Sequence, residues 1–471
     1  MKIYIKDTED LKVRFIASDK EDICCDKVKN LFDKKFFTGD LGEVFLDLDE
    51  GKPSLFVGLG KMADYSLDNM KIAGLKAGQK LAKIGAEKVM LKFCSKAEDK
   101  NEQVLAVLEG ILNSTYSFDN YKSKKSDPCK LSEINICPKC AENLKDADIN
   151  ELLDKWAGIV FARDLVNTPA NDMTPSILAE NAQSLKELGV DVKVYGQKEI
   201  EGFDMKAYLS VARGSNEEPK LIVMEYMKGE GAPIVLVGKG LTYDSGGYSL
   251  KPSDGMKTMK SDMGGSAAVI GAMKAIAKSG LKKNVVAIVA ACENMLDGGA
   301  YKPGDIIGSM KGLTIEVDNT DAEGRLTLAD AVHYGEKNYK PKMIIDLATL
   351  TGACLVAVGQ HYSGVIGRCD KCINTVLDAA KAEGEKAWGL PYGKDFQELN
   401  KSEIADIKNT GGRFGGSSSA GEFVGAFLEP STPWAHVDIA GPAFNSAPYR
   451  YEPAGATGHM VKTLYRIVKE S

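Results

Sequence analysis

The chain carries no excess of positive charge and contains no long hydrophobic run. Its 471 residues include 60 lysines and arginines and 66 acidic residues, which gives a formal net charge of −6. This balance gives no support to nucleic-acid binding, which depends on a basic surface. No apolar run reaches the roughly 18–20 residues that are needed to cross a bilayer. Residues 1–7 also lack the apolar core and cleavage site of a signal peptide, so we expect a cytoplasmic protein.

The chain is also poor in histidine. Its four histidines are His333, His361, His436 and His459. No two of them have the spacing of an H-E-x-x-H metal motif. A metal site in this chain is therefore expected to rely on oxygen ligands rather than on a histidine triad.

Cysteine is present, but its pattern does not indicate a disulfide framework. Among ten cysteines, Cys137/Cys140 and Cys369/Cys372 have C-x-x-C spacing, which is compatible with zinc or redox chemistry. The two pairs are far apart, and we expect neither to lie beside a helix start in a thioredoxin-like strand–helix context. We interpret them as structural or incidental thiols, and we expect no disulfides in a reducing compartment. Apolar surroundings predict core positions for Cys24, Cys25, Cys94, Cys292 and Cys354.

Length and composition indicate a globular protein of more than one domain. The chain is 44% hydrophobic and 27% charged, which is enough to build real cores, and its length is typical of two to three domains. Strand and helix patterns alternate, which predicts an α/β fold with mixed or mostly parallel sheets flanked by helices. We expect a smaller N-terminal domain at 1–147, a connecting helix at 148–170 and a larger catalytic domain at 171–471.

The periodicity of apolar residues places the individual elements. In the first domain, strands are predicted at 1–7, 54–60, 88–93 and 134–137, and helices at 68–84, 103–111 and 148–166. In the second, strands are predicted at 190–195, 220–227, 233–238, 284–291, 313–317, 342–347 and 435–439, and helices at 175–188, 265–278, 327–338 and 458–469. Residues 121–128 are polar and basic and predict an exposed loop, and the glycines and serines of 411–419 predict a flexible loop.

Two glycine-rich segments, 239–265 and 319–326, carry most of the chemistry. They contain four carboxylates that follow predicted strands, where ligands bind in open α/β sheets. Gathered together, these acids would repel one another and stay partly protonated, whereas two divalent cations would neutralise them. Asp321 and Glu323 are two residues apart, so in extended backbone they would point the same way. The candidate ligands are Asp244, Asp262, Asp321 and Glu323.

Three cationic residues lie in the same segments: Lys239, Lys251 and Arg325. A lysine amine binds metal only when it is unprotonated, which a dicationic site can enforce. A second lysine that stays charged could stabilise an oxyanion, and an arginine could hold a planar anion. The residues alone leave simpler alternatives open, because loop acids often cap helices and lysines often form surface ion pairs.

The octapeptide at 319–326, Asn-Thr-Asp-Ala-Glu-Gly-Arg-Leu, resembles the signature of the leucyl (cytosol) aminopeptidases, a family of dinuclear metallo-exopeptidases, at every position. The stretch 237–265 is similar to the other metal-binding segment of the family. The resemblance covers most of 160–471, and the first 150 residues share only general α/β character. Further similar stretches are 163–171, 346–353, 405–409 and 434–441.

The resemblance implies a role for each candidate residue. Asp244 and Glu323 would bind both metals, Asp321 would complete one site, and Lys239 and Asp262 would complete the other. Lys251 and Arg325 would be the catalytic residues, with a bicarbonate at Arg325 as general base. The pocket for the first side chain would be lined by Met259, Thr349, Gly352 and Ala440. The family often has a larger residue where this chain has Ala443, which predicts a pocket that is wider or differently shaped and argues against a strict preference for leucine.

The function implied by the resemblance is removal of N-terminal residues, leucine and others, from peptides by a water that two metal ions, Mn²⁺ or Zn²⁺, activate. The partners would be peptides with a free N-terminus, and the assembly a homohexamer of two stacked trimers. The residues alone leave two alternative functions open. A two-metal phosphoesterase uses similar carboxylates, but the chain has no P-loop or basic groove. A DNA-binding scaffold would use the N-terminal domain, where residues 122–125 form the only local basic cluster.

Overall fold

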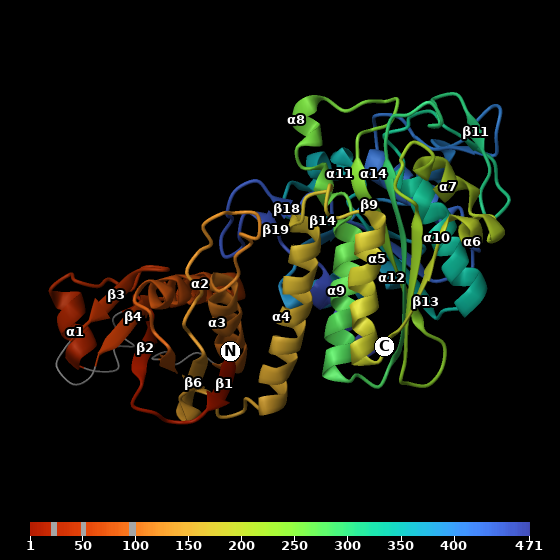
Figure 1. Cartoon of the computed structure of the whole chain (residues 1–471). Coiled ribbons are helices and arrows are strands. Elements are labelled where there is room, and N and C mark those ends of the chain that lie inside the picture. Colours follow the sequence, from red (N-terminus) through yellow and green to blue (C-terminus); the bar gives the residue numbers. More distant parts are fainter. Residues whose placement is uncertain (20–25, 49–52, 94–99) are drawn as a thin grey trace. The chain divides into compact units, whose positions relative to one another are not determined.

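The computed structural model describes residues 1–19, 26–48, 53–93 and 100–471, and Figure 1 shows the whole chain. The chain divides into two compact units. The first comprises residues 1–156 with 447–453, and the second comprises 157–446 with 454–471. Three of the cysteines expected in a core, Cys24, Cys25 and Cys94, lie outside the described residues.

The first unit is built on a sheet that has six strands within the described residues, in the order β1-β6-β5-β2-β4-β3. Only the β3–β4 pair is antiparallel, so the sheet is mixed and mostly parallel, as predicted. The strands are β1 (Lys2–Ile5), β2 (Leu11–Ile16), β3 (Val44–Asp47), β4 (Ser54–Gly58), β5 (Lys88–Phe93) and β6 (Glu133–Ile136).

Helices α2 and α3 bury apolar faces against the sheet and share one core with it, whereas α1 packs in a separate cluster with Phe37 and Phe56. At the start of α2, the Ser66 hydroxyl accepts a hydrogen bond from the Asn69 backbone N–H and satisfies one free donor of the first turn. The loop predicted at 121–128 is confirmed, and all of its residues are exposed. The helices are α1 (Asp26–Asp33), α2 (Leu67–Lys83) and α3 (Lys100–Ser114), and α4 (Asp146–Asn167) begins in this unit and ends in the second. Two short 3₁₀ turns are η2 (Met62–Asp64) and η3 (Pro138–Cys140).

The second unit contains an eight-stranded mixed sheet in the order β15-β14-β17-β13-β9-β10-β8-β7, all within the continuous described stretch from 100 onwards. Its centre, β17-β13-β9-β10, is parallel, and antiparallel pairs β14–β17, β10–β8 and β8–β7 flank it. The strands of this sheet are β7 (Asp191–Tyr195), β8 (Lys220–Met227), β9 (Ile234–Asp244), β10 (Asn284–Asn294), β13 (Met343–Ala348), β14 (Ser363–Gly367), β15 (Ala387–Gly389) and β17 (Trp434–Asp438). Short strands outside it are β11 (Ile306–Ile307), β12 (Ile315–Glu316), β16 (Ile407–Lys408), β18 (Phe444–Asn445) and β19 (Gly455–Ala456).

Helices cover both faces of this sheet (Figure 1). Gly238 of β9 lies against the backbone of Ser266 in α9, whereas the neighbouring Val235 lies against Gly335 in α10. Because alternate strand residues face opposite sides, α9 and α10 lie on opposite faces. Both faces of β9, β10 and β13 are therefore buried, which explains their nearly continuous apolar runs.

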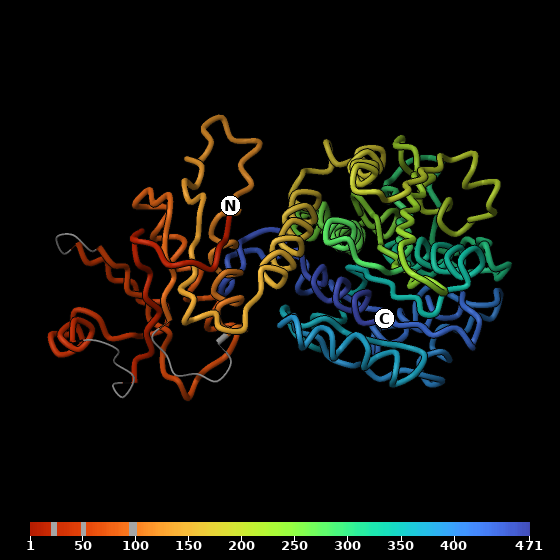
Figure 2. Tube along the Cα trace, turned by 90° about the horizontal axis from the view of Figure 1, so that it is seen from below, coloured from red at the N-terminus to blue at the C-terminus, as the bar shows by residue number. Residues whose placement is uncertain are grey.

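The remaining helices complete the layers, and α15 packs beside α12, as Figure 2 also shows. The helices are α5 (Pro175–Gln183), α6 (Gln197–Gly202), α7 (Lys206–Ala212), α8 (Ser253–Met256), α9 (Gly264–Ser279), α10 (Gly324–Tyr339), α11 (Gly352–Val358), α12 (Asp370–Glu383), α13 (Lys394–Glu398), α14 (Gly416–Gly425) and α15 (Val461–Glu470). Two 3₁₀ turns, η4 (Ser184–Leu188) and η5 (Met259–Ser261), also occur. No helix in the described part of the chain is long and apolar enough to cross a membrane.

Three local predictions were wrong. The strand predicted at 233–238 continues to Asp244 as β9, because it stays paired with β10 beyond Gly238, where its pairing with β13 ends. Asp321 lies in a turn rather than in extended backbone. The loop predicted at 411–419 becomes helix α14 at Gly416, where burial of its serines outweighs their weak helix propensity.

The cysteines also differ from expectation in one respect. Cys292 and Cys354 are buried as predicted, and all seven described cysteines are free thiols. Cys369, however, is the N-cap residue of α12 and follows β14 by two residues. The prediction that neither C-x-x-C pair lies beside a helix start after a strand was therefore wrong, since β14 is short and was not recognised from the sequence.

Candidate metal centre

The four candidate carboxylates lie at the ends of elements in the second unit. Asp244 is the last residue of β9, and Asp262 is the C-cap residue of η5. Asp321 lies in the turn before α10, and Glu323 is the N-cap residue of that helix. A carboxylate beside the first turn of a helix is favoured by the positive end of the helix dipole. The fold thus brings together acids from segments separated by up to 79 positions in the sequence, Asp244 to Glu323.

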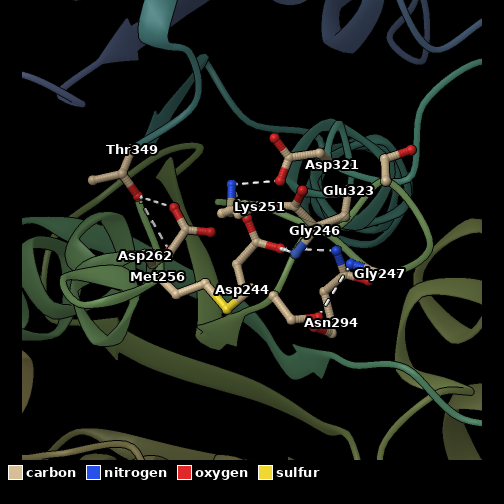
Figure 3. Close-up of polar contacts among 12 residues, drawn as sticks. Asp244, Gly246, Gly247, Lys251, Met256, Asp262, Asn294, Asp321, Glu323 and Thr349 are labelled. Atoms are coloured by element: carbon tan, nitrogen blue, oxygen red, sulfur yellow. Dashed lines mark hydrogen bonds and ion pairs between the residues drawn. The ribbon is translucent and has the colours of Figure 1, made fainter. Parts of the chain in front are cut away.

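Three of these acids form a compact buried cluster. One carboxylate oxygen from each of Asp244, Asp262 and Glu323 lies within 4.8 Å of the others. Each of the three residues is at most 5% exposed. Figure 3 shows their side chains converging on a common space, with Asp321 beside them. Three carboxylates this close in a dry environment require positive charge nearby.

Lys239 supplies part of that charge. Its Nζ lies 2.7 Å from Asp262 Oδ2 and 2.8 Å from Glu323 Oε1, and it donates a hydrogen bond to the Thr349 carbonyl at 3.0 Å. Burial alone would lower the pKa of Lys239, but Asp262, Glu323 and Asp244 outweigh it, so the pKa is raised. Lys239 is thus an ammonium group that bridges two acids.

Lys251 bridges the other two acids. Its Nζ lies 2.7 Å from Asp244 Oδ2 and 2.5 Å from Asp321 Oδ1, and Figure 3 shows the contact with Asp321 as a dashed line. Burial opposes the charged form here as well, and the carboxylates of Asp244 and Glu323 again raise the pKa. Lys251 therefore draws Asp321, whose side chain is one-third exposed, towards the buried cluster.

The acids in the cluster also hold protons more tightly than usual. Burial is the main cause that raises the pKa of Asp244, Asp262 and Asp321, and neighbouring carboxylates add to it. The lysines pull in the opposite direction, but two ammonium groups cannot balance four carboxylates. The excess of negative charge favours protons on Asp244, Asp262 and Asp321, and it also favours any divalent cation there.

Two polar residues that the sequence did not single out as ligands or catalytic groups hold the acids in place. Asn294, at the end of β10, donates from Nδ2 to Asp244 Oδ1 at 2.8 Å and to the Thr320 carbonyl at 3.0 Å. Thr349, which was predicted only to line a pocket, donates from Oγ1 to Asp262 Oδ1 at 2.8 Å. Asn294 could have been noticed as a polar residue that ends a long apolar strand.

The turn after Asp244 depends on glycine. The Gly246 N–H donates to Asp244 Oδ1 at 2.9 Å, and Gly246 has a φ of +87°. A Cβ there would lie 2.5 Å from the Ser249 carbonyl oxygen and 2.9 Å from Asp321 Oδ1. Only glycine combines this left-handed backbone with so close an approach, which explains the Asp-Ser-Gly-Gly sequence at this point.

Arg325 lies in the first turn of α10 and is 8% exposed. Its Nη1 donates to the Asn409 carbonyl at 2.6 Å, while its Nε, also buried, has no hydrogen-bond partner among the described residues. Burial lowers the pKa of the guanidinium to about 10. Asn409 also accepts from the backbone N–H of Asp318 at 2.8 Å, so it fixes both the arginine and the turn that carries Asp321. Asn409 lies in one of the similar stretches (405–409), but no role was predicted for it.

Among the predicted pocket residues, Thr349 contacts the centre through Asp262, and Met259 and Gly352 lie three residues from Asp262 and Thr349 in the chain. Met259 begins η5, the turn that leads to Asp262. Gly352 begins α11, where a Cβ would meet nothing within 4 Å. Asp438 connects the segment after β13 with the segment after β17, which carries Ala440. Its Oδ1 accepts hydrogen bonds from the backbone N–H groups of Leu350 at 3.2 Å and Ala440 at 3.1 Å.

The donor set fits divalent cations. Glu323 Oε2 is buried and has no hydrogen-bond partner among the described residues, which is costly for a carboxylate oxygen. A cation would satisfy it. Carboxylate oxygens with a possible amine nitrogen suit hard or borderline metals such as Mn²⁺ and Zn²⁺. The structure brings together all five predicted ligands, Lys239, Asp244, Asp262, Asp321 and Glu323, through the contacts described above.

Comparisons with known proteins give matches over most of the chain. A family model described as "Cytosol aminopeptidase family, catalytic domain" matches residues 160–465, and one described as "Cytosol aminopeptidase family, N-terminal domain" matches residues 9–125. A probable cytosol aminopeptidase of Treponema denticola is 45% identical over 450 residues, covering 94% of each chain. One of Clostridium tetani is 44% identical and covers 100% of this chain and 99% of its own.

Solved structures with the same fold include two enzymes. A tomato leucine aminopeptidase mutant has a TM-score of 0.89 and 31% identity, covering 100% of this chain and 97% of its own. The bottromycin maturation enzyme BotP in complex with Mn has a TM-score of 0.88 and 30% identity, covering 98% and 99%. Both similarities extend over both units of the chain.

Proposed function

The chain belongs to the cytosol aminopeptidase family, and from this premise we propose how its residues carry out metal-dependent aminopeptidase activity. The activity itself follows from the family and from the likeness to a leucine aminopeptidase, and it takes precedence over the phosphoesterase and DNA-binding alternatives. The observation that carries the residue-level proposal is the buried cluster of Asp244, Asp262 and Glu323. We assign catalysis to the C-terminal domain, which we take as residues 171–471 after a connecting segment at 148–170.

Two divalent cations are proposed to bind the five ligand candidates. Asp244 and Glu323 lie centrally in the cluster and would contact both cations. Lys239 and Asp262, 2.7 Å apart, would complete one site, and Asp321 would complete the other. Lys239 would have to lose its proton to act as a ligand. The Mn complex of the similar enzyme supports Mn²⁺ as one candidate metal, with Zn²⁺ as the other.

Bound cations of this kind supply an activated water, polarise the scissile carbonyl and hold a free α-amine. The chain's own residues do the rest. Lys251, whose pKa is raised, stays charged and can donate to the oxyanion that develops on the carbonyl. Asn294 and Thr349 hold Asp244 and Asp262 at fixed angles, so that the ligands need little reorganisation.

Arg325 is proposed to hold a bicarbonate ion, which would take up the proton of the attacking water. The guanidinium keeps a donor, Nε, without a partner among the described residues, and Asn409 fixes its orientation. Paired N–H groups suit a planar anion. The negative charge of the nearby acids would repel such an anion, so it would bind at the arginine rather than among the acids.

The pocket for the first side chain is proposed to be lined by Met259, Thr349, Gly352 and Ala440. Ala443 and Thr349 both lie beside Gly264. A Cβ at Gly264 would be 3.3 Å from both Ala443 Cβ and Thr349 Cγ2. The small side chain at 443 leaves space beside Thr349. We therefore expect bulky first residues, such as phenylalanine and methionine, to be accepted along with leucine.

The wider setting is also a proposal. We propose that the protein acts in the cytoplasm on peptides with a free N-terminus, and that it assembles as a homohexamer. Size-exclusion chromatography with light scattering should give about six times the 50.7 kDa of the chain. Elution as a monomer would contradict the proposed assembly.

The test of the function uses one peptide in two forms. The free peptide should lose residues one at a time from its N-terminus, as a ladder of masses in a time course. The same peptide with an acetylated N-terminus should stay intact, because it has no free α-amine. Internal cleavage of the acetylated peptide, or cleavage of neither form in the presence of Mn²⁺ or Zn²⁺, would overturn the proposal.

A further inference from the structure

The pair Cys369 and Cys372 lies at the start of α12, directly after β14, and takes no part in the metal centre. Cys369 is the N-cap residue, and Cys372 lies in the first turn, where its N–H donates to the Cys369 carbonyl at 3.0 Å. The two Sγ atoms are 3.0 Å apart. The thiols therefore face each other at van der Waals contact or less, held there by the backbone of the helix start.

The two thiols differ in access to solvent. Cys369 is exposed, whereas Cys372 is only 4% exposed. A dissolved disulfide can reach Cys369 but not Cys372. This arrangement, with one accessible thiol and one sheltered thiol beside it, is the one that thiol–disulfide exchange requires: the first sulfur attacks and the second resolves the mixed disulfide.

The electrostatics of the pair agree with that division. A hydrogen bond from the Cys372 thiol lowers the pKa of Cys369, and backbone N–H groups at the start of α12 act in the same direction. Burial raises the pKa of Cys372. A thiolate is therefore favoured on the accessible sulfur, as is usual for a cysteine at a helix N-terminus.

A structural zinc site does not explain the pair. Such a site needs four ligands, commonly cysteines or histidines, and the acid cluster is the only group of three or more candidate ligands within the described residues. The other C-x-x-C pair provides a contrast. Cys137 and Cys140 are both buried, and they surround a short 3₁₀ turn rather than the start of an α-helix.

We propose that Cys369 and Cys372 form a redox-active dithiol site that reacts with low-molecular-weight disulfides such as oxidised glutathione. The Cys369 thiolate attacks one sulfur of the disulfide, forming a mixed disulfide and releasing one thiol. Cys372, losing its proton, then attacks Cys369 Sγ, which forms the internal disulfide and releases the second thiol. The protein dithiol is oxidised by two electrons, and the small disulfide is reduced to two thiols. The proposal does not depend on the peptidase mechanism.

The sequence offers a direct readout. The whole protein is equilibrated in glutathione buffers of increasing oxidised fraction, quenched with acid, alkylated and digested with trypsin. Trypsin cleaves after Arg368, Lys371 and Lys381, so a disulfide leaves peptide 369–371 linked to peptide 372–381. The same digest separates Cys137 from Cys140 at Lys139, so the second pair serves as a matched internal control.

The linked peptide should appear in one two-electron transition, while Cys137 and Cys140 remain alkylated over the same range. Cys372→Ser should stop the reaction at a glutathione adduct on Cys369, and Cys369→Ser, a change at an exposed position, should abolish both products. The proposal is overturned if the linked peptide does not form before Cys137 and Cys140 react, or if the wild-type chain ends as the glutathione adduct. If Cys372 still forms a disulfide in Cys369→Ser, another cysteine is its partner, and that result would also overturn the proposal.

Discussion

At the scale of single residues, the centre is governed by the ratio of acids to ammonium groups. Lys239 and Lys251 each touch two carboxylates, and each has a raised pKa because carboxylates outweigh the effect of burial. The two lysines differ in surroundings. Lys239 is deeply buried at 3% side-chain exposure, whereas Lys251 keeps 16% and lies nearer the solvent from which a substrate arrives.

Replacing Lys251 with alanine should lower kcat by about 10²- to 10³-fold, since one oxyanion donor is lost. Metal content, measured by elemental analysis, should stay near that of the wild type. Lys257→Ala is a matched control, because among the residues that the structure describes Lys257 pairs only with the exposed Asp254. Turnover of Lys251→Ala close to that of Lys257→Ala would show that the role assigned to Lys251 is wrong.

Asp330 is a buried acid outside the metal centre. It accepts backbone N–H groups from Tyr208 at 3.0 Å and Met310 at 2.8 Å. Burial raises its pKa to about 7 despite these donors. The folded chain therefore binds a proton here that the unfolded chain, with a pKa near 3.8, has released. This contribution to stability is fully present below the unfolded pKa and is lost as the pH rises towards 7.

The pH dependence can be isolated with Asp330→Asn. The variant cannot titrate at this position, so its thermal midpoint should rise relative to the wild type as the pH increases from about 4 to about 7. Relative to the variant, the free energy of unfolding of the wild type should fall by on the order of 1.4 kcal/mol per pH unit. Midpoints of both proteins measured at matched pH values would provide the test, and a constant difference across this range would contradict the raised pKa.

At the scale of elements, α10 organises the centre. Its N-cap is Glu323, its first residue is Gly324, and Arg325 follows. A Cβ on Gly324 would lie 2.4 Å from Lys239 Cε and 2.7 Å from its Nζ. The glycine in the signature octapeptide thus provides the space that Lys239 needs to reach both Asp262 and Glu323.

Gly324→Ala should therefore displace Lys239 and weaken metal binding, although alanine favours the helix itself. A decrease in affinity of about tenfold or more is expected, which corresponds to roughly 1.4 kcal/mol. Calorimetric titration of the metal-free protein with Mn²⁺ measures this directly. Gly202→Ala in α6, where a Cβ meets nothing within 4 Å, is the control and should bind as the wild type does. Equal affinities for the two variants would contradict the packing argument.

The elements that the sequence predicted well are those with long, uniform apolar patterns. β5 and β8 were predicted with their observed bounds, and α9 and α10 within three residues at each end. The failures have local causes. β9 passes through Lys239 and Gly240, which read as a loop but remain paired with β10. The serines at the start of α14 are polar, yet Ser417, Ser418 and Ser419 are buried by packing that no local pattern reveals.

At the scale of the whole molecule, the metal centre lies entirely within the second unit, while the family models match both units. The ligand candidates could be found from the sequence because two short segments carry them all. Residues that act through tertiary contacts could not be found in this way. Asn409, for example, reaches Arg325 and Asp318 across more than 80 positions, and no motif connects them.

The central claim is that two divalent cations in the acid cluster make this chain an aminopeptidase. The most direct test is to strip the protein with a chelator, restore Mn²⁺ or Zn²⁺ in steps, and follow cleavage of a leucyl chromogenic amide with its acetylated form as control. We predict no activity in the stripped protein, recovery that is complete at two equivalents per chain, and no cleavage of the acetylated amide. Full activity in the stripped protein, or cleavage of both amides alike, would contradict the account.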